Sequence, residues 1–237
     1  MKVEFHKSKS RGHANHGWLD TYHTFSFANY FNPKRMGFGA LRVLNDDRIA
    51  PERGFGMHPH DNMEIITIPL RGELEHRDNM GNVAVVSAGE IQVMSAGTGV
   101  FHSERNSSED LETELLQIWV QPNRKGVTPR YDQIRLSDSI PKNELYQIVS
   151  PDKSGPGMWI HQDAWFSLGE FDSGKGAPYA LHSRKSGVYL FCLDGGFEVG
   201  EHRLEPRDGV GVSEVSEIEL TAFQAGRILV MEVPMND

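Results

Sequence analysis

The feature that most constrains the fold is a succession of short strand-like segments separated by turn signals. In the first half, apolar runs occupy 41–44, 64–68, 83–86, 91–94 and 115–120, and similar runs follow at 145–149, 158–161, 188–193, 197–199 and 228–231. The first run is expected to end at the turn Asn45-Asp46-Asp47. No long stretch shows the apolar period of an amphipathic helix. Many brief strands with turns between them are typical of sandwiches and barrels, so the sequence predicts an all-β fold.

Composition narrows the class of protein. The net charge of −9 argues against binding to nucleic acid or to anionic membranes, both of which need a basic face. Cys192 is the single cysteine, which excludes an intrachain disulfide and favours a reducing compartment. Residues 1–10 lack the apolar region of a signal peptide, and no apolar run is long enough to span a bilayer. These features predict a cytoplasmic protein.

A weak internal repeat suggests how the strands are organised. The pattern of residues 70–75 returns at 193–198, and that of 86–89 returns at 206–209. Two tandem copies of one barrel would explain both, although unrelated hairpins can also look alike. Residues 121–138 are polar and read as a connector. We therefore expect an N-terminal barrel over 1–122, a connector over 123–144 and a C-terminal barrel over 145–237.

Two short motifs carry the candidate chemistry. In His58-Pro59-His60 and His102-Ser103-Glu104, the polar residues are two positions apart, which places them on the same face of a β-strand. If the two strands face one another, three imidazoles and one carboxylate converge. Either pair alone is weak evidence, because exposed histidines are often idle. Nitrogen and oxygen ligands without thiolates disfavour a structural zinc or iron–sulfur site and suit a transition metal with open coordination positions.

The same segments resemble the cupin superfamily. Gly54-x3-His58-x-His60-x3-Glu64 resembles the first cupin motif, and Gly99-x2-His102-x3-Asn106 after Gly89 resembles the second. More narrowly, the N-terminal half is similar to the pirin family. That similarity rests on Gly17-Trp18-Leu19, Thr24-Phe25-Ser26-Phe27, residues 41–47, His58-Pro59-His60, residues 95–99 and His102-Ser103-Glu104. The resemblance implies a bicupin with one metal in the N-terminal barrel, held by His58, His60, His102 and Glu104, and quercetin 2,3-dioxygenase-type activity in bacterial members.

Other residues are candidates for the surroundings of the metal. Glu64 has the strand parity of His58 and His60, and the first-motif glutamate is a ligand in ordinary cupins. Pirin-like proteins instead draw the carboxylate from the second motif, so we expect Glu104 to be the ligand. Glu64 would then contact the ligand residues without binding the metal, or lie on the surface. Gln117 is expected beside the metal, and Phe38, with Phe25 and Phe27, either walls an aromatic-substrate cavity or belongs to the core.

The repeat predicts that the second barrel has no metal site. Its positions aligned with the ligands are Leu181, Ser183 and Ala222, which offer at most one weak ligand. His161, His182 and His202 also occur in this half, but no two of them are two residues apart.

These observations lead to one main expectation of function. The chain is expected to be a dioxygenase that opens a flavonol-like or related enolisable aromatic substrate with dioxygen, with Glu104 as the base. The cofactor is expected to be one divalent transition metal per chain, iron first, with copper, nickel, cobalt, manganese or zinc as alternatives. The competing hypothesis is a non-catalytic, metal- and redox-sensing protein that regulates a protein partner. Another cupin reaction, such as isomerisation, is a third hypothesis.

Overall fold

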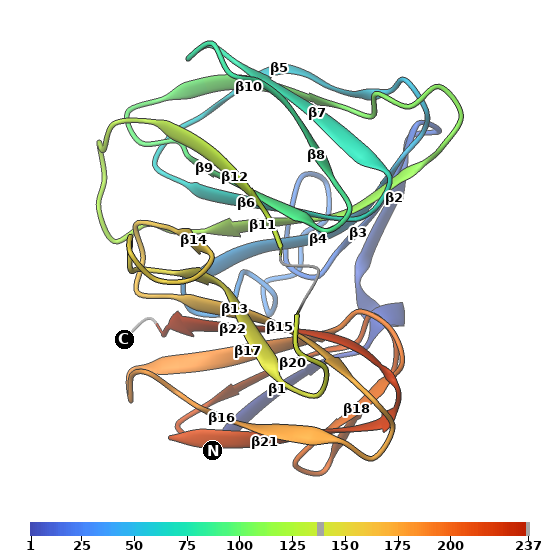
Figure 1. Ribbon diagram of the computed structural model, residues 1–237, viewed down its shortest axis with the longest axis vertical. Helices are drawn as coiled ribbons and strands as arrows, with labels where there is room; N and C mark the ends of the chain where they lie inside the picture. Colours follow the sequence, from blue (N-terminus) through green and yellow to red (C-terminus); the bar gives the residue numbers. More distant parts are fainter. Residues whose placement is uncertain (137–139, 236–237) are drawn as a thin grey trace.

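The computed structural model describes residues 1–136 and 140–235, and strands dominate it. Its one helical segment among these residues is the short 3-10 helix η1 (Ser8–Ser10). Figure 1 shows two β halves, one above the other. The predicted all-β fold of two tandem jelly-roll cupin domains is confirmed. Within the described residues, no helix has the length and apolar character needed to cross a membrane.

The first half consists of a large and a small antiparallel sheet. The large sheet has the strand order β12-β9-β6-β11-β4-β3-β2, and the small sheet has the order β5-β10-β7-β8. Their bounds are β2 (Gly12–Asn15), β3 (Leu19–His23), β4 (Leu41–Ile49), β5 (Gly54–His60), β6 (Glu64–Arg71), β7 (Glu73–Asp78), β8 (Val83–Ser87), β9 (Glu90–Ser95), β10 (Val100–Arg105), β11 (Thr113–Val120) and β12 (Arg130–Arg135).

The second half repeats this architecture. Its large sheet has the order β1-β20-β17-β22-β15-β13-β14, and its small sheet has the order β16-β21-β18-β19. The bounds are β1 (Lys2–His6), β13 (Leu145–Ser150), β14 (Met158–Trp159), β15 (Trp165–Phe171), β16 (Gly176–Ala180), β17 (Ser186–Cys192), β18 (Gly196–Val199), β19 (His202–Leu204), β20 (Gly209–Ser213), β21 (Glu217–Gln224) and β22 (Gly226–Pro234).

The two large sheets pack against each other through a shared apolar core. Alternation along each strand sends one set of side chains to this interface and the other into the barrel. On β11, Leu116 and Ile118 face the second half and are fully buried, as are Tyr189 on β17 and Met231 on β22 from the opposite side. The largest core cluster of the described residues therefore lies between the halves, where the two large sheets face one another (Figure 1).

The interiors of the two barrels differ in chemistry. The second barrel is filled by an apolar cluster that includes Val188, Leu190, Phe197 and Val230. The interior of the first barrel contains buried polar side chains, namely Asp47, Thr67, His76, Gln92, His102 and Glu104. Because buried polar groups must be hydrogen-bonded or bind a ligand, the first barrel is the half in which a functional site is to be sought.

The pairing of strands β1 and β12 shows which half each of them joins. β1 pairs with β20, so the N-terminal strand joins the large sheet of the second half (Figure 1). β12 lies in the expected connector 123–144 and pairs with β9 of the first half. Residues 137–139 of that connector, and 236–237 of the expected C-terminal barrel, lie outside the described residues.

The turn predicted at Asn45-Asp46-Asp47 is wrong, because β4 continues through it to Ile49. The polar side chains are buried but each has a partner. Asn45 Oδ1 is 2.9 Å from His23 Nδ1, Asp46 accepts from Arg11 at 3.1 Å, and Asp47 accepts from the Thr21 hydroxyl. Satisfied side chains let a strand carry residues whose local preference is for turns.

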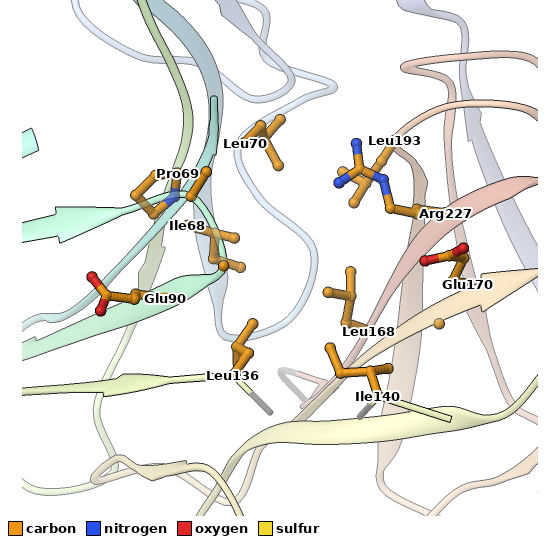
Figure 2. A pocket seen from close by; sticks show the side chains of 13 residues that line it. Ile68, Pro69, Leu70, Glu90, Leu136, Ile140, Leu168, Glu170, Leu193 and Arg227 are labelled. Carbon is orange, nitrogen blue, oxygen red and sulfur yellow. The ribbon is translucent and has the colours of Figure 1, made fainter. Parts of the chain in front are cut away.

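A cavity of about 240 Å³ lies between the halves (Figure 2). Its walls are mainly apolar and include Ile68, Leu70, Leu136, Ile140 and Leu168. The charged groups at its edge already have protein partners. Arg227 is bonded to Asp194, and Glu90 accepts the backbone N–H of Ser87. We therefore treat this cavity as a gap in the packing between the sheets.

Candidate metal centre

Adjacent strands of the small sheet bring the two histidine motifs together. β5 and β10 are antiparallel neighbours, and His102 is the register partner of His58. Along β5, the side chain of Met57 faces solvent and is 58% exposed, while His58 and His60 are half-buried. The alternation predicted from the sequence is therefore present, and both motifs point into the barrel.

The three imidazoles form one compact group. Ligand nitrogens of His58, His60 and His102 all lie within 4.8 Å of one another. The ring centroids are 4.4 Å apart for His58 and His102 and 4.9 Å apart for His60 and His102. His58 Nδ1 is 2.8 Å from the Gly56 carbonyl oxygen, so it donates there and leaves Nε2 as a free lone pair.

Burial keeps the imidazoles of His60 and His102 neutral. Burial, reinforced by the neighbouring His58 and His60, lowers the pKa of His102 to about 2. Burial, followed by the effect of His58, lowers the pKa of His60 to about 4. Neutral imidazoles are the form that binds metals, so protons compete weakly for these two histidines near neutral pH.

Glu104 lies next to this group and is held by amides and a hydroxyl. Gln117 Nε2 donates to Oε2 at 2.8 Å, and the Gln92 amide and the Thr67 hydroxyl each lie 3.4 Å from Oε1. Burial raises the pKa of Glu104 to about 7 despite these bonds. Its carboxylate lies within 4.8 Å of ligand nitrogens of both His76 and His102. Gln117, expected beside the metal, therefore contacts the carboxylate expected to be a ligand.

His76 is a site residue that the sequence reasoning missed. It lies on β7, which pairs with β10, and its side chain is fully buried between Asp78 and His102. The only sequence signal is parity: Leu74, His76 and Asp78 share one strand face. The charged residues in Glu75-His76-Arg77-Asp78 are typical of a solvent-exposed strand, so the sequence alone does not reveal the burial of His76.

Glu64 lies away from the three imidazoles. It is 1% exposed and accepts from the Ser95 hydroxyl at 2.7 Å, so the surface location considered for it is wrong. It belongs to β6 of the large sheet, whereas His58 and His60 belong to β5 of the small sheet. The turn between the two strands breaks the parity that linked these residues in the sequence.

Phe38 does not wall the metal site. It is buried in the core between the halves, with its ring centroid 5.6 Å from that of Tyr189. Phe38 forms an isolated antiparallel β-bridge with Leu41, the first residue of β4. Aromatic side chains near the site include Trp119, 4.8 Å from the His60 ring, and Phe27, 5.3 Å from the Trp119 ring.

The remaining histidines of the second half have separate partners. His161 contacts Trp159, His182 contacts Trp165, and His202 stacks on Phe5. Among the described residues, both groups of side chains with the spacing of metal ligands lie in the first half: His58, His60 and His102, and His76, His102 and Glu104.

The chemistry of the first barrel fits one divalent transition metal. His102 Nε2 is buried and has no hydrogen-bond partner. An unpaired buried nitrogen is costly unless it binds something, and this one belongs to the three-imidazole group. Neutral imidazoles with a nearby carboxylate suit iron, cobalt, nickel and copper ions.

Comparisons with known proteins agree with this geometry. Residues 4–120 match the Pirin family, and residues 147–233 match the family described as quercetinase C-terminal cupin domain. The quercetin 2,3-dioxygenase of Escherichia coli (strain K12) is 40% identical over 98% of this chain and 99% of its own. A pirin-like protein of Caulobacter vibrioides is 38% identical, with 93% of this chain and 95% of its own covered.

Solved structures extend the likeness to the whole fold. The crystal structure of YhhW from Escherichia coli has a TM-score of 0.95, 39% identity and 99% coverage of both chains. A second structure shows this bacterial pirin in complex with nickel(II), with a TM-score of 0.94, 38% identity, and 99% of this chain and 100% of that chain covered. These names support the predicted enzyme class. From its full-length similarity to these relatives, the chain belongs to the pirin family of two-barrel cupin proteins, alongside enzymes named quercetin 2,3-dioxygenase.

Proposed function

We propose that this protein is a metal-dependent dioxygenase that opens a flavonol-like or related enolisable aromatic substrate. The observation that carries the proposal is the convergence of His58, His60 and His102 on one point, with a buried, unpaired Nε2 on His102. Full-length relatives named quercetin 2,3-dioxygenase support the substrate class.

We assign His58, His60, His102 and Glu104 as the metal ligands. When bound, the metal would supply Lewis acidity and a place where substrate and dioxygen meet. Iron remains the expected native metal, and the nickel(II) complex of the E. coli pirin supports a transition metal at a site of this kind. Metal analysis of protein purified without a histidine tag tests the choice.

The residues of this chain would bind and deprotonate the substrate. Glu104 is the basic group beside the imidazoles, and on leaving or loosening its bond to the metal it would accept the proton of the substrate hydroxyl. Gln117, Gln92 and Thr67 would hold the carboxylate in place while it does so. Trp119 and Phe27 would form an aromatic wall near His60. In a dioxygenase the substrate supplies the electrons that reduce dioxygen, so no external reductant is needed.

The experiment is dioxygen uptake with quercetin. Metal-free protein is loaded in turn with iron, copper, nickel, cobalt or manganese, and His102→Ala treated in the same way serves as the control. The proposal expects uptake by the wild-type protein with at least one metal and none above background by His102→Ala. If the wild type takes up no dioxygen with any of the five metals, the regulatory alternative, in which the protein binds a protein partner, replaces the catalytic one.

We also propose that the two halves have different tasks. The first barrel, expected over 1–122, would carry the chemistry, and the second, expected over 145–237, would serve as a scaffold. The apolar filling of the second barrel supports this division.

A further inference from the structure

His76 occupies an unusual position between a carboxylate and a histidine of the candidate metal centre. Its Nε2 is 3.0 Å from Asp78 Oδ2, and its Nδ1 is 3.5 Å from His102 Nδ1. The ring stacks on Tyr131 with centroids 4.3 Å apart. Side chains of His76 and Asp78 are fully buried. Both ring nitrogens of His76 are used in these two contacts, so the ring has no further nitrogen for another hydrogen bond.

Asp78 is fixed by the turn that follows β7. Its Oδ1 accepts the backbone N–H groups of Met80 and Asn82 at 2.9 and 3.0 Å, and Oδ2 accepts from the Asn82 side chain at 2.8 Å. A carboxylate surrounded by donors acts as an acceptor only. His76 Nε2 must therefore carry the hydrogen that it donates to Asp78.

The hydrogen on His76 Nε2 determines, one after another, which of the remaining ring nitrogens of His76 and His102 carry a hydrogen. A neutral His76 with its hydrogen on Nε2 has a lone pair on Nδ1, so it can accept from His102. His102 must then carry its hydrogen on Nδ1, which leaves the lone pair on Nε2. That nitrogen is the buried atom without a protein partner, in the group with His58 and His60. Hydrogen-bond partners behind a ligand histidine commonly fix its tautomer and orientation in this way.

We propose that Asp78 and His76 form a positioning relay that holds His102 in the Nδ1-protonated tautomer and directs its Nε2 lone pair toward the metal centre. His76 is a positioning residue in this account and does not itself bind the metal. Tyr131, supplied by β12, keeps the His76 ring in plane by stacking. The metal-directing part rests on the proposed function, while the tautomer of His102 does not depend on it.

The first test uses metal-free protein and reads the tautomer directly. Long-range nitrogen–proton correlation NMR on ¹⁵N-histidine-labelled protein distinguishes a hydrogen on Nδ1 from one on Nε2. We expect His102 to be Nδ1-protonated in the wild type and to lose that preference in His76→Phe, whose ring can still stack on Tyr131. A wild-type His102 protonated on Nε2 would overturn the proposal.

The second test measures affinity for Zn²⁺ by competition with a chelator. His76→Phe is expected to bind about 10- to 100-fold more weakly, the loss typical of removing a partner behind a ligand histidine. His76→Asn restores an acceptor near the position of Nδ1 and is expected to recover most of the loss. Equal weakening in both variants, with both folded by circular dichroism, would show that His76 only fills space and would contradict the relay.

A matched control is available in the other half. His182 also stacks on an aromatic ring, Trp165 at 4.2 Å, and its Nδ1 is 2.8 Å from the buried Glu232 carboxylate. His182→Phe therefore makes a similar change away from the candidate metal centre, and its Zn²⁺ affinity is expected to equal that of the wild type.

The same measurements separate failure of the relay from failure of the metal assignment. If His76→Phe abolishes Zn²⁺ binding as completely as His102→Ala, His76 is itself a ligand and the relay is wrong. If His102→Ala keeps full affinity while wild-type His102 is Nδ1-protonated, the tautomer relay stands and the ligand assignment of the proposed function fails.

Discussion

His102 is the residue on which the candidate site depends most. Its side chain is buried, its Nε2 has no protein partner, and its Nδ1 faces His76. No other histidine of the group combines these features, because His58 and His60 are only half-buried.

Replacing His58 or His102 by alanine is expected to remove the metal without unfolding the protein. The core between the halves is apolar and does not include these side chains, so we expect the metal to be a functional ligand and not the support of the fold. Metal content per folded chain, with circular dichroism to confirm folding, measures the effect. Retention of a full equivalent of metal by His102→Ala would rule out its assignment as a ligand.

Two buried glutamates of the first half provide a second comparison. Glu104→Gln is expected to weaken metal binding by at least about 10-fold, because it removes an anion beside the cation in a dry cavity. Glu64→Gln makes the same change in a carboxylate that is bonded to Ser95 and lies outside the ligand groups, so metal affinity should stay near that of the wild type. Parallel titrations with one metal compare them, and the reverse order would identify Glu64 as the ligand.

Local spacing in the sequence predicts the histidine motifs of the site, but it does not predict contacts that form only when distant strands pair. The spacing within each motif placed His58 with His60 and His102 with Glu104, whereas their convergence also required that the two strands face one another. His76 could not be found in this way, because its contact with His102 exists only when β7 pairs with β10. Phe38 was misplaced for a related reason: an aromatic residue near a β-core packs wherever the chain turns, here against Tyr189.

At the scale of the element, the N-terminal strand β1 belongs to the large sheet of the second half. It pairs with β20, and its last residue, His6, lies 2.8 Å from the Tyr189 hydroxyl through Nδ1. Burial, with a smaller effect of Arg35, lowers the pKa of His6 to about 4. The folded protein therefore keeps His6 neutral at pH values where an unfolded chain would protonate it.

This difference makes His6 a source of acid sensitivity. Between pH 6.5 and about 4 the unfolded state binds a proton at this position that the folded state does not, so stability falls as the pH falls. In His6→Gln the slope of unfolding free energy against pH should decrease by at most about 1.4 kcal/mol per pH unit in that window. Urea unfolding from pH 7 to pH 4.5 measures it. An unchanged slope would contradict a neutral His6.

The extent of several elements could not be deduced from composition. β4 continues through Asn45-Asp46-Asp47 because partners from distant segments satisfy these side chains, and a sequence does not reveal such partners. In contrast, the apolar runs at 64–68 and 115–120 predicted β6 and β11 well, because a strand buried on both faces leaves a short apolar run in the sequence.

At the scale of the whole molecule, one architecture is used twice with two different interiors. The halves share sheet sizes and pack through their large sheets, yet among the described residues both groups of side chains with the spacing of metal ligands lie in the first half. The aligned position Ala222 lies in the apolar cluster of the second barrel, next to Phe197. The central claim of this account is that a single metal centre in the first barrel carries the chemistry.

Calorimetric titration of the intact, metal-free protein with one divalent ion, Ni²⁺, tests that claim most directly. Wild type and His182→Ala should each bind one ion per chain, and His102→Ala should bind none tightly. Two tight sites in the wild type, the second of them abolished by His182→Ala, would contradict the account and place a metal centre in the second barrel.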